Sequence, residues 1–307
     1  MMSTSGNSSS HPVSFILLGI PGLENSQFWV AFPFCAMYVV VLVGNITLLH
    51  VIRTDPTLHE PMYLFLAMLA TTDLVLSTST QPKMLAIFWF HDHEIEYHAC
   101  LIQLFFIHAF SSSSVLLAMA FDRYIAICNP LRYATILTNS RIIKVGFAIV
   151  VRVTTVVRLN FCPGKILLSH SFCFHADVMK RACADITVNI IYGLYVVLST
   201  MGIDSLLIVL SYTLILHTVM SLASPRERIR ALNTCVSHIL AVLVFFIPVI
   251  GVSMIHRFGR HLPPIVHALV AYVYLVVPPV LNPIIYSVKS KPIRKAMLRV
   301  LREKRKG

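Results

Sequence analysis

Full charges stand inside or at the edges of long apolar runs in this chain, and such charges are candidates for chemistry. Asp122, Arg123 and Tyr124 follow one another in the run LAMAFDRYIAIC, and Asp73 interrupts a second run. A carboxylate or guanidinium is costly in lipid unless it pairs with another group or faces a polar interior. The pattern predicts a functional switch at Asp122 and Arg123 or, as the alternative, a purely structural pair at a helix end.

Arg257 is a further isolated charge, just beyond the last apolar turn of the run that ends at Ile255. A guanidinium is always charged and can bind a carboxylate through two parallel hydrogen bonds. This chemistry suits an anchor for an acidic ligand in a partly dry pocket. The alternative is a cation that reaches the outer lipid headgroups.

Seven apolar segments are available to position these residues. The chain is 57% hydrophobic and only 12% charged, and an α-helix needs about 20 residues to cross a membrane. We therefore predict an all-α membrane protein, a seven-transmembrane helix bundle. The predicted spans are Phe28 to Ile52, Met62 to Trp89, Cys100 to Ile127, Val145 to Val157, Val188 to Val219, Leu232 to Ile255 and Ile265 to Val288. The fourth is short and is interrupted by Arg152.

Positive charge predicts the orientation, with the N-terminus outside and the C-terminus in the cytosol. In this arrangement 17 of the 25 Lys and Arg residues fall in cytosolic segments, as the positive-inside rule expects. Without the fourth span this bias would be reversed. The net charge of +12 therefore belongs to the membrane surface, with lipids as partners, and not to a nucleic-acid site.

The spans divide the chain into an extracellular segment (residues 1–27), a seven-span domain (28–288) and a cytosolic tail (289–307). The first segment lacks the features of a cleavable signal peptide and holds a glycosylation sequon at Asn7. In the tail, one helical face would carry four apolar residues: Ile293, Met297, Val300 and Leu301. This spacing predicts a short amphipathic helix on the inner leaflet, with a solvated basic tail as the alternative.

Longer motifs resemble those of rhodopsin-like G-protein-coupled receptors, and among them the olfactory (odorant) receptors. The resemblance covers almost the whole chain and is carried by PMYLFLAMLATTDL, MAFDRYIAICNPLRY, SY at 211–212, RALNTCVSHI and NPIIY. The segments FILLGIPGLE, LSHSFCFHADVMK and HRFG resemble the class I, or fish-like, subset.

The resemblance implies a multi-pass plasma-membrane receptor, not an enzyme, that needs no cofactor or metal. Its partners would be a small-molecule odorant outside and a heterotrimeric G protein of the olfactory stimulatory type inside. In the family the Arg of the triplet is held by its Asp at rest and released on activation, which would make Asp122 and Arg123 a two-state lock. The other expected switch residues are Tyr124, Tyr212, His238, Asn282, Pro283 and Tyr286. Asn45 and Asp73 would share a hydrated polar network with Asn282, while Arg226, Arg228 and Arg230 would shape the cytosolic mouth.

The resemblance also makes Arg257 an anchor for the carboxylate of fatty-acid odorants. The other expected ligand-binding residues are Ser253, His108, His175, Gly193 and Val197, although each histidine could equally be a buried interior residue. The family pairs Cys100 with Cys173 and Cys162 with Cys183. The sequence alone leaves this connectivity open.

The chain departs from the family pattern in two places. The stretch from Cys100 to Arg123 is two residues shorter than usual, which shortens a helix by about 3 Å and rotates its ends by about 200°, so His108 need not face the pocket. The fourth span lacks roughly eight apolar residues after Arg152. One alternative is therefore a non-signalling or poorly folding deletion variant. A transporter is less favoured because no internal repeat is found.

Overall fold

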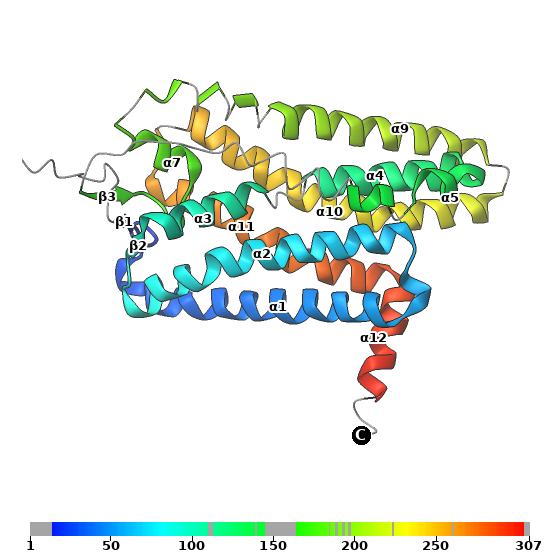
Figure 1. Ribbon diagram of the computed structural model, residues 1–307, viewed down its shortest axis with the longest axis horizontal. Coiled ribbons are helices and arrows are strands. Elements are labelled where there is room, and N and C mark those ends of the chain that lie inside the picture. Colours follow the sequence, from blue (N-terminus) through cyan, green and yellow to red (C-terminus); the bar gives the residue numbers. More distant parts are fainter. Residues whose placement is uncertain are drawn as a thin grey trace, which may run out of the picture.

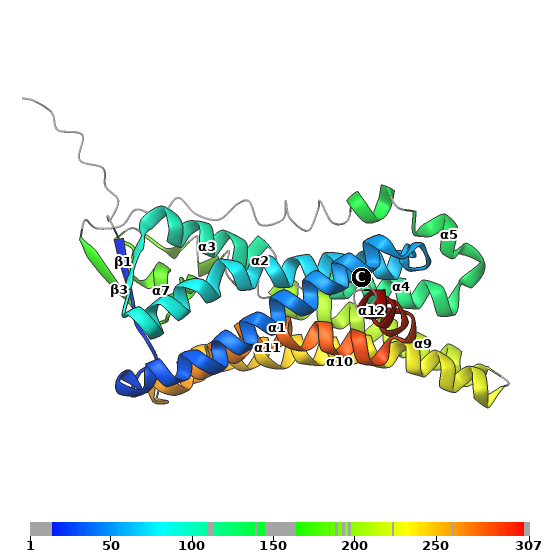
Figure 2. The ribbon, with the colours of Figure 1, turned by 90° about the horizontal axis from the view of Figure 1, so that it is seen from below.

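A computed structural model describes residues 14–109, 113–138, 140–144, 164–183, 185–187, 190–191, 194–195, 198–222, 224–259 and 261–303. Figures 1 and 2 show long helices that run side by side along the longest axis of the molecule. The long helices are α1 (Gln27–Thr54), α2 (Pro61–Phe90), α3 (Tyr97–Ala109), α4 (Ser113–Cys128), α9 (Ser205–Ser221), α10 (Pro225–Phe258), α11 (Pro264–Lys289) and α12 (Lys291–Glu303).

Within the described residues, five helices are long and apolar enough to cross a membrane. Four of them, α1, α2, α10 and α11, each contain one of the predicted spans. The fifth is α9 together with the end of the π-helical segment η4 (Leu198–Asp204) that precedes it. The predicted third span is described as α3 and α4, on either side of residues 110–112, and the predicted fourth span lies outside the described residues.

Buried apolar side chains fill both ends of the bundle. One cluster centres on Phe15, Phe88 and Tyr272, and the second joins α1, α2, α4, α10 and α11 around residues such as Phe65 and Tyr286. Gly44 permits the close approach of α1 to α11, because a Cβ atom at this position would lie only 3.0 Å from the ring carbons of Pro283.

A small sheet covers the end of the bundle at which α2 ends and α3 begins. Its strands are β1 (Ser14–Leu17), β2 (Glu94–Glu96) and β3 (Lys165–Leu168), in the order β2-β1-β3. The central strand β1 pairs antiparallel with β2 and parallel with β3, and its alternate residues Phe15 and Leu17 are fully buried. The part of the N-terminal segment that begins at Ser14 is therefore built into the fold, which the sequence did not predict.

The short elements connect the helices. They are η1 (Glu24–Ser26), η2 (Pro56–Leu58), η3 (Pro130–Arg132), α5 (Tyr133–Ile136) and α7 (His175–Lys180). Of these, α7 lies at the same end as the sheet, whereas α5 lies at the opposite end (Figure 1).

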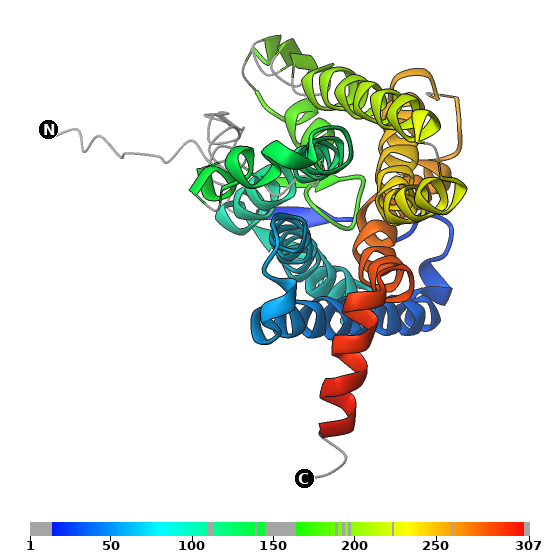
Figure 3. The same ribbon diagram turned by 90° about the vertical axis from the view of Figure 1, so that its right-hand side faces the viewer.

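The expected amphipathic tail helix is present as α12, which leaves the bundle at an angle to the long helices (Figures 1 and 3). Ile293 is fully buried, and Met297 and Val300 pack against the same apolar cluster. On the polar side, Arg299 lies 3.3 Å from the carboxylate of Asp55. The apolar residues predicted to share a face thus dock this helix on α1 and α11, except for Leu301, whose side chain lies outside the described residues.

Candidate functional site

A cavity of about 820 Å³ lies at the outer end of the bundle, between α7, the end of α10 and the start of α11. The lining residues are Ser169, His170, Phe174, Ala176, Asp177, Lys180, His256, Arg257, Phe258, Leu262, Pro264 and His267. Arg257, the predicted anchor, is therefore in the wall of the cavity, with Lys180 as a second permanent cation. In the part of the chain that the structure describes, Arg257 makes no salt bridge with a carboxylate.

Among the described residues that line the cavity, Asp177 is the only one with a carboxylate, and this carboxylate is already engaged. Asp177 accepts hydrogen bonds from the backbone amide and the hydroxyl of Ser169, and it lies 3.6 Å from the imidazole of His170. Burial alone would raise the pKa of Asp177, but these contacts hold its pKa below the usual value. Asp177 is thus ionised at neutral pH and holds the loop, leaving the guanidinium of Arg257 available for a ligand.

Two stacked histidines form another part of the wall. His267 Nε2 lies 3.0 Å from the carbonyl oxygen of Gly259, which can only accept, so this nitrogen carries the proton in the neutral ring. The remaining nitrogen, Nδ1, then accepts from Nδ1 of His256 at 3.4 Å. This assignment leaves His256 Nε2 as an acceptor, buried and without a hydrogen-bond partner among the described residues.

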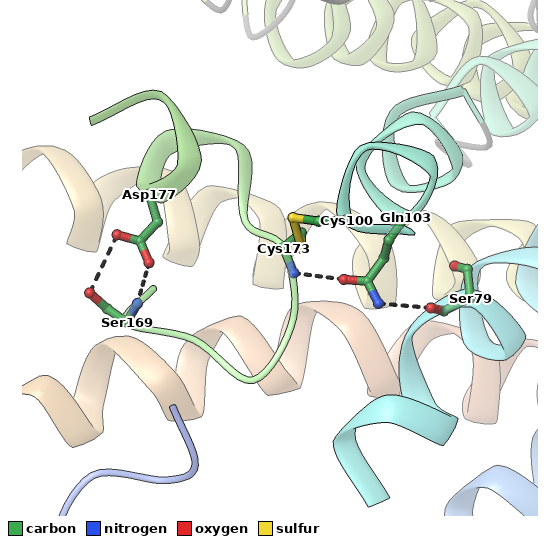
Figure 4. Close-up of a disulfide and its surroundings, with 6 residues drawn as sticks. All are labelled: Ser79, Cys100, Gln103, Ser169, Cys173 and Asp177. Atoms are coloured by element: carbon green, nitrogen blue, oxygen red, sulfur yellow. Dashed lines mark hydrogen bonds between the residues drawn. A yellow bond between two sulfur atoms is a disulfide. The ribbon is translucent and has the colours of Figure 1, made fainter. Parts of the chain in front are cut away.

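The loop that covers the bundle is attached through the predicted disulfide between Cys100 and Cys173, which is confirmed, with Cα atoms 5.6 Å apart. Figure 4 shows that Gln103 of α3 reinforces this attachment. Its carbonyl oxygen accepts from the amide of Cys173 at 2.6 Å, and its amide group donates to the carbonyl oxygen of Ser79 at 2.8 Å. Three segments are therefore joined at one buried point beneath the loop.

At the cytosolic end, Arg123 donates to the carboxylate of Asp122 from Nε at 2.9 Å and from a terminal nitrogen at 2.6 Å. The hydroxyl of Tyr133 donates to the other carboxylate oxygen at 2.8 Å. Asp122 is fully buried and Arg123 is 9% exposed, so this ion pair is shielded from water. Tyr124 is half-buried and packs beside α9. The sequence pointed to the pair but missed Tyr133, which is brought in by the short helix after α4.

A second polar chain joins α9, α10 and α4. Nε2 of His238 lies 3.0 Å from the carbonyl oxygen of Leu116 and must carry the proton, because a carbonyl only accepts. The hydroxyl of Tyr212 therefore donates to Nδ1 of His238, at 2.5 Å. Tyr286 lies nearby, with its hydroxyl 4.0 Å from the sulfur of Met119.

The amide side chains expected in the membrane interior are also brought together. Asn282 donates to Asp73 at 2.9 Å, and Asn45 donates to the carbonyl oxygens of Val41 and Pro279. One oxygen of Asp73, of Asn45 and of Asn282 is buried without a partner among the described residues, which fits the prediction of a hydrated network. The side chain of Asn45 contacts α11 through the backbone carbonyl oxygen of Pro279 and makes no hydrogen bond with the side chain of Asn282.

Comparison with known proteins decides the family. The olfactory receptor family model matches residues 34–304. The chain belongs to the olfactory receptor family. Among human relatives it is 57% identical to Olfactory receptor 52R1, over 95% of this chain and 96% of the relative. It is 54% identical to Olfactory receptor 51G1 (95% and 94%) and 52% identical to Olfactory receptor 51E1 (98% and 96%).

Membership confirms the coarse predictions. The olfactory receptor is a multi-pass membrane protein, a non-enzymatic G-protein-coupled receptor that responds to odorants. The ion pair of Arg123 accordingly lies on the G-protein side of the receptor, and the network around Asp73 lies between that side and the odorant side.

The remaining predicted site residues of the receptor fall into two groups. Ser253 and His175 are described, but neither is among the residues that line the cavity. Their ligand role stays a prediction, as does the role of the residues outside the described part: Asn7, Cys162, Gly193, Val197 and the side chain of His108. Cys183 takes part in a disulfide, and its expected partner Cys162 lies outside the described residues.

Sequence reasoning missed several residues of the cavity, notably His170, His256, His267 and Lys180. His256 directly precedes Arg257, so its place on the last turn of α10 was a usable signal. The others come from α7, from the loop before it and from α11, and only the fold brings them beside α10.

The comparison also bears on the expected deletions. The alignment with human Olfactory receptor 51F2 runs over 313 positions, six more than the 307 residues of this chain. That relative therefore has at least six residues with no counterpart here, while the shortening expected in the third and fourth spans stays a prediction.

Proposed function

We propose that this olfactory receptor detects small carboxylic acids, with Arg257 as the anchor for the carboxylate, and activates a G protein of the olfactory stimulatory type. The observation that carries the proposal is the position of Arg257 in the cavity wall with no carboxylate partner among the described residues. Placing an anion beside this guanidinium would create a charge-assisted, bidentate hydrogen bond in a partly enclosed space. Lys180 adds a second positive charge to the same cavity.

The apolar part of the lining suits the alkyl chain of such an acid. Phe174, Phe258 and Leu262 line the cavity together with the cations. Burying one additional methylene group contributes about 0.8 kcal/mol, or roughly a fourfold gain in affinity. We therefore expect potency to rise with chain length until the acid fills the cavity.

The first test measures cyclic AMP in cells that express the receptor with the olfactory G protein. Straight-chain acids should activate the receptor, whereas the alcohols and methyl esters of the same length should not. Arg257→Gln should raise the half-maximal concentration of an acid by about 10-fold to 100-fold. This loss of affinity corresponds to the free energy of a hydrogen bond to a charged group. Arg257→Lys should keep part of the response, since lysine keeps the positive charge but cannot form two parallel hydrogen bonds with a carboxylate.

The matched control is Lys165→Gln, which removes one positive charge from the same end of the molecule. Lys165 lies in β3, pairs with Glu94 at 3.2 Å and is not in the cavity lining. It should leave the acid response unchanged. Equal responses to acids and alcohols, or an acid response that survives Arg257→Gln at normal surface level, would exclude the anchor.

A further inference from the structure

A buried carboxylate that none of the preceding sections uses connects α9 to α4. Asp204 ends the π-helical segment η4, is 3% exposed, and accepts a hydrogen bond from the hydroxyl of Ser113 at 3.1 Å. Ser113 is the first residue of α4 and is 1% exposed. Asp204 lies within an apolar helix long enough to cross the membrane, where an unpaired carboxylate is costly.

The contact between Asp204 and Ser113 is one part of a closed polar ring. One turn along α4 from Ser113, the carbonyl oxygen of Leu116 accepts from His238 of α10. His238 in turn accepts from Tyr212, which lies eight residues, or two turns, beyond Asp204 on α9. Three hydrogen bonds thus form a ring between helices: one joins α4 to α10, one joins α10 to α9, and one joins α9 back to α4.

The backbone before α9 is suited to aiming Asp204 at α4. Residues Leu198–Asp204 form a π-helix, which carries more residues in each turn than the α-helix that follows and therefore changes the direction of the side chains. Asp204 is the junction between the two geometries. Its bond to Ser113 connects the start of α9, two turns before Tyr212, to the start of α4.

We propose that Asp204 and Ser113 are positioning residues for signalling, which hold α9 so that Tyr212 keeps His238 and α10 closed against α4. The bond between His238 and Leu116 must break if α10 is to move away from α4. In this structure Arg123 is bound to Asp122, so the ring belongs to the resting arrangement. Loss of the Asp204–Ser113 bond shifts the population toward the open arrangement without any ligand.

The inference rests on coupling to a G protein and is independent of which odorant the cavity binds. The test therefore uses the intact receptor without odorant, and it normalises cyclic AMP to the surface level. Ser113→Ala and Asp204→Ala should each raise basal signalling by about threefold to tenfold, as expected for one buried hydrogen bond. Asp204→Asn keeps an oxygen that can accept from Ser113 and should stay close to wild type.

The matched control is Ser211→Ala. The hydroxyl of Ser211 donates to the carbonyl oxygen of Leu207 in its own helix, so the substitution removes the same group without touching another helix. Basal signalling should not change in this control.

Tyr212→Phe, like Ser113→Ala, should raise basal signalling. The double variant Ser113→Ala/Tyr212→Phe should raise it by less than the product of the two single increases, because both substitutions act on the same ring.

A second readout does not involve a G protein. Spin labels at position 131, in η3 just beyond the end of α4, and at position 229 in α10 report the separation of the cytosolic ends of the two helices; the native leucine and isoleucine are 98% and 61% exposed. In a background without other reactive thiols, Ser113→Ala should increase the fraction with the longer separation. Unchanged separation together with unchanged basal signalling at normal surface level would overturn the proposal. So would a double variant whose increase in basal cyclic AMP equals the product of the increases caused by Ser113→Ala and Tyr212→Phe alone.

Discussion

At the scale of single residues, the loop over the cavity depends on titratable groups that are held in one protonation state. His175 begins α7, and burial lowers its pKa below the usual 6.5. The folded state therefore prefers the neutral ring. As the pH falls below 6.5 the unfolded state takes up a proton more readily, so the folded loop loses stability with acidification.

The loss of stability on acidification leads to a first prediction. The melting temperature of the purified receptor should fall between pH 7.5 and pH 5.5, and His175→Gln should make the fall smaller. His98→Gln, at an exposed position of α3, serves as the control and should leave the pH dependence as it is in wild type. A pH profile that His175→Gln does not alter would show that another group is responsible.

Residue types alone identified the isolated charges but not all of their partners. Asp122, Arg123 and Arg257 could be singled out because each is costly in an apolar setting. Tyr133, Gln103 and His267 could not, since a tyrosine, an amide or a histidine near a helix end has many ordinary positions. Their roles follow from distances between segments far apart in the chain.

At the scale of elements, the contact of α1 with α11 depends on one missing side chain. A Cβ atom at Gly44 would lie 3.0 Å from the Cβ and Cγ atoms of Pro283, and a proline ring cannot turn away. Gly44→Ala should therefore separate the two helices and cost about 1–3 kcal/mol of stability. Thermal unfolding in detergent measures the loss.

Gly251→Ala provides the matched control on α10. The added Cβ would lie 3.6 Å from a methyl group of Val270, an ordinary packing distance. Because alanine also restricts the unfolded chain, this variant should be as stable as wild type or more stable by about 0.5–1 kcal/mol. If both variants lost the same stability, close approach to Pro283 could not be the reason.

Helix positions were predictable from apolar length, and the spans contained in α1, α2, α10 and α11 agree with the structure. Two features could not be foreseen. The π-helical segment before α9 lies inside the predicted fifth span, and the length of that span gives no sign of a change in helix type. The strands are three or four residues long and depend on pairing between distant segments.

At the scale of the whole molecule, the fold class followed from composition and charge, and the sequence further predicts that the lengths of the third and fourth spans limit how well the receptor folds. A helix that is two residues short presents its two ends at a changed angle, and a short fourth span covers less of the hydrocarbon. Since the aligned relative is longer within the matched region, restoring residues is a direct test.

Inserting two residues near Ser112 and about eight apolar residues after Arg152 should raise the amount of receptor at the cell surface. Flow cytometry on cells with an extracellular tag measures this amount. The control inserts the same residues after Leu131, which is 98% exposed, and should bring no gain. If the restored chain reached the surface no better than the original, the short spans would be tolerated.

The three-stranded sheet also imposes an order on biosynthesis. Its central strand, Ser14–Leu17, leaves the ribosome first, yet it needs Glu94–Glu96 on one side and Lys165–Leu168 on the other. Until more than half of the chain has been translated, this strand lacks both partners, and its backbone groups must be hydrogen-bonded by water instead.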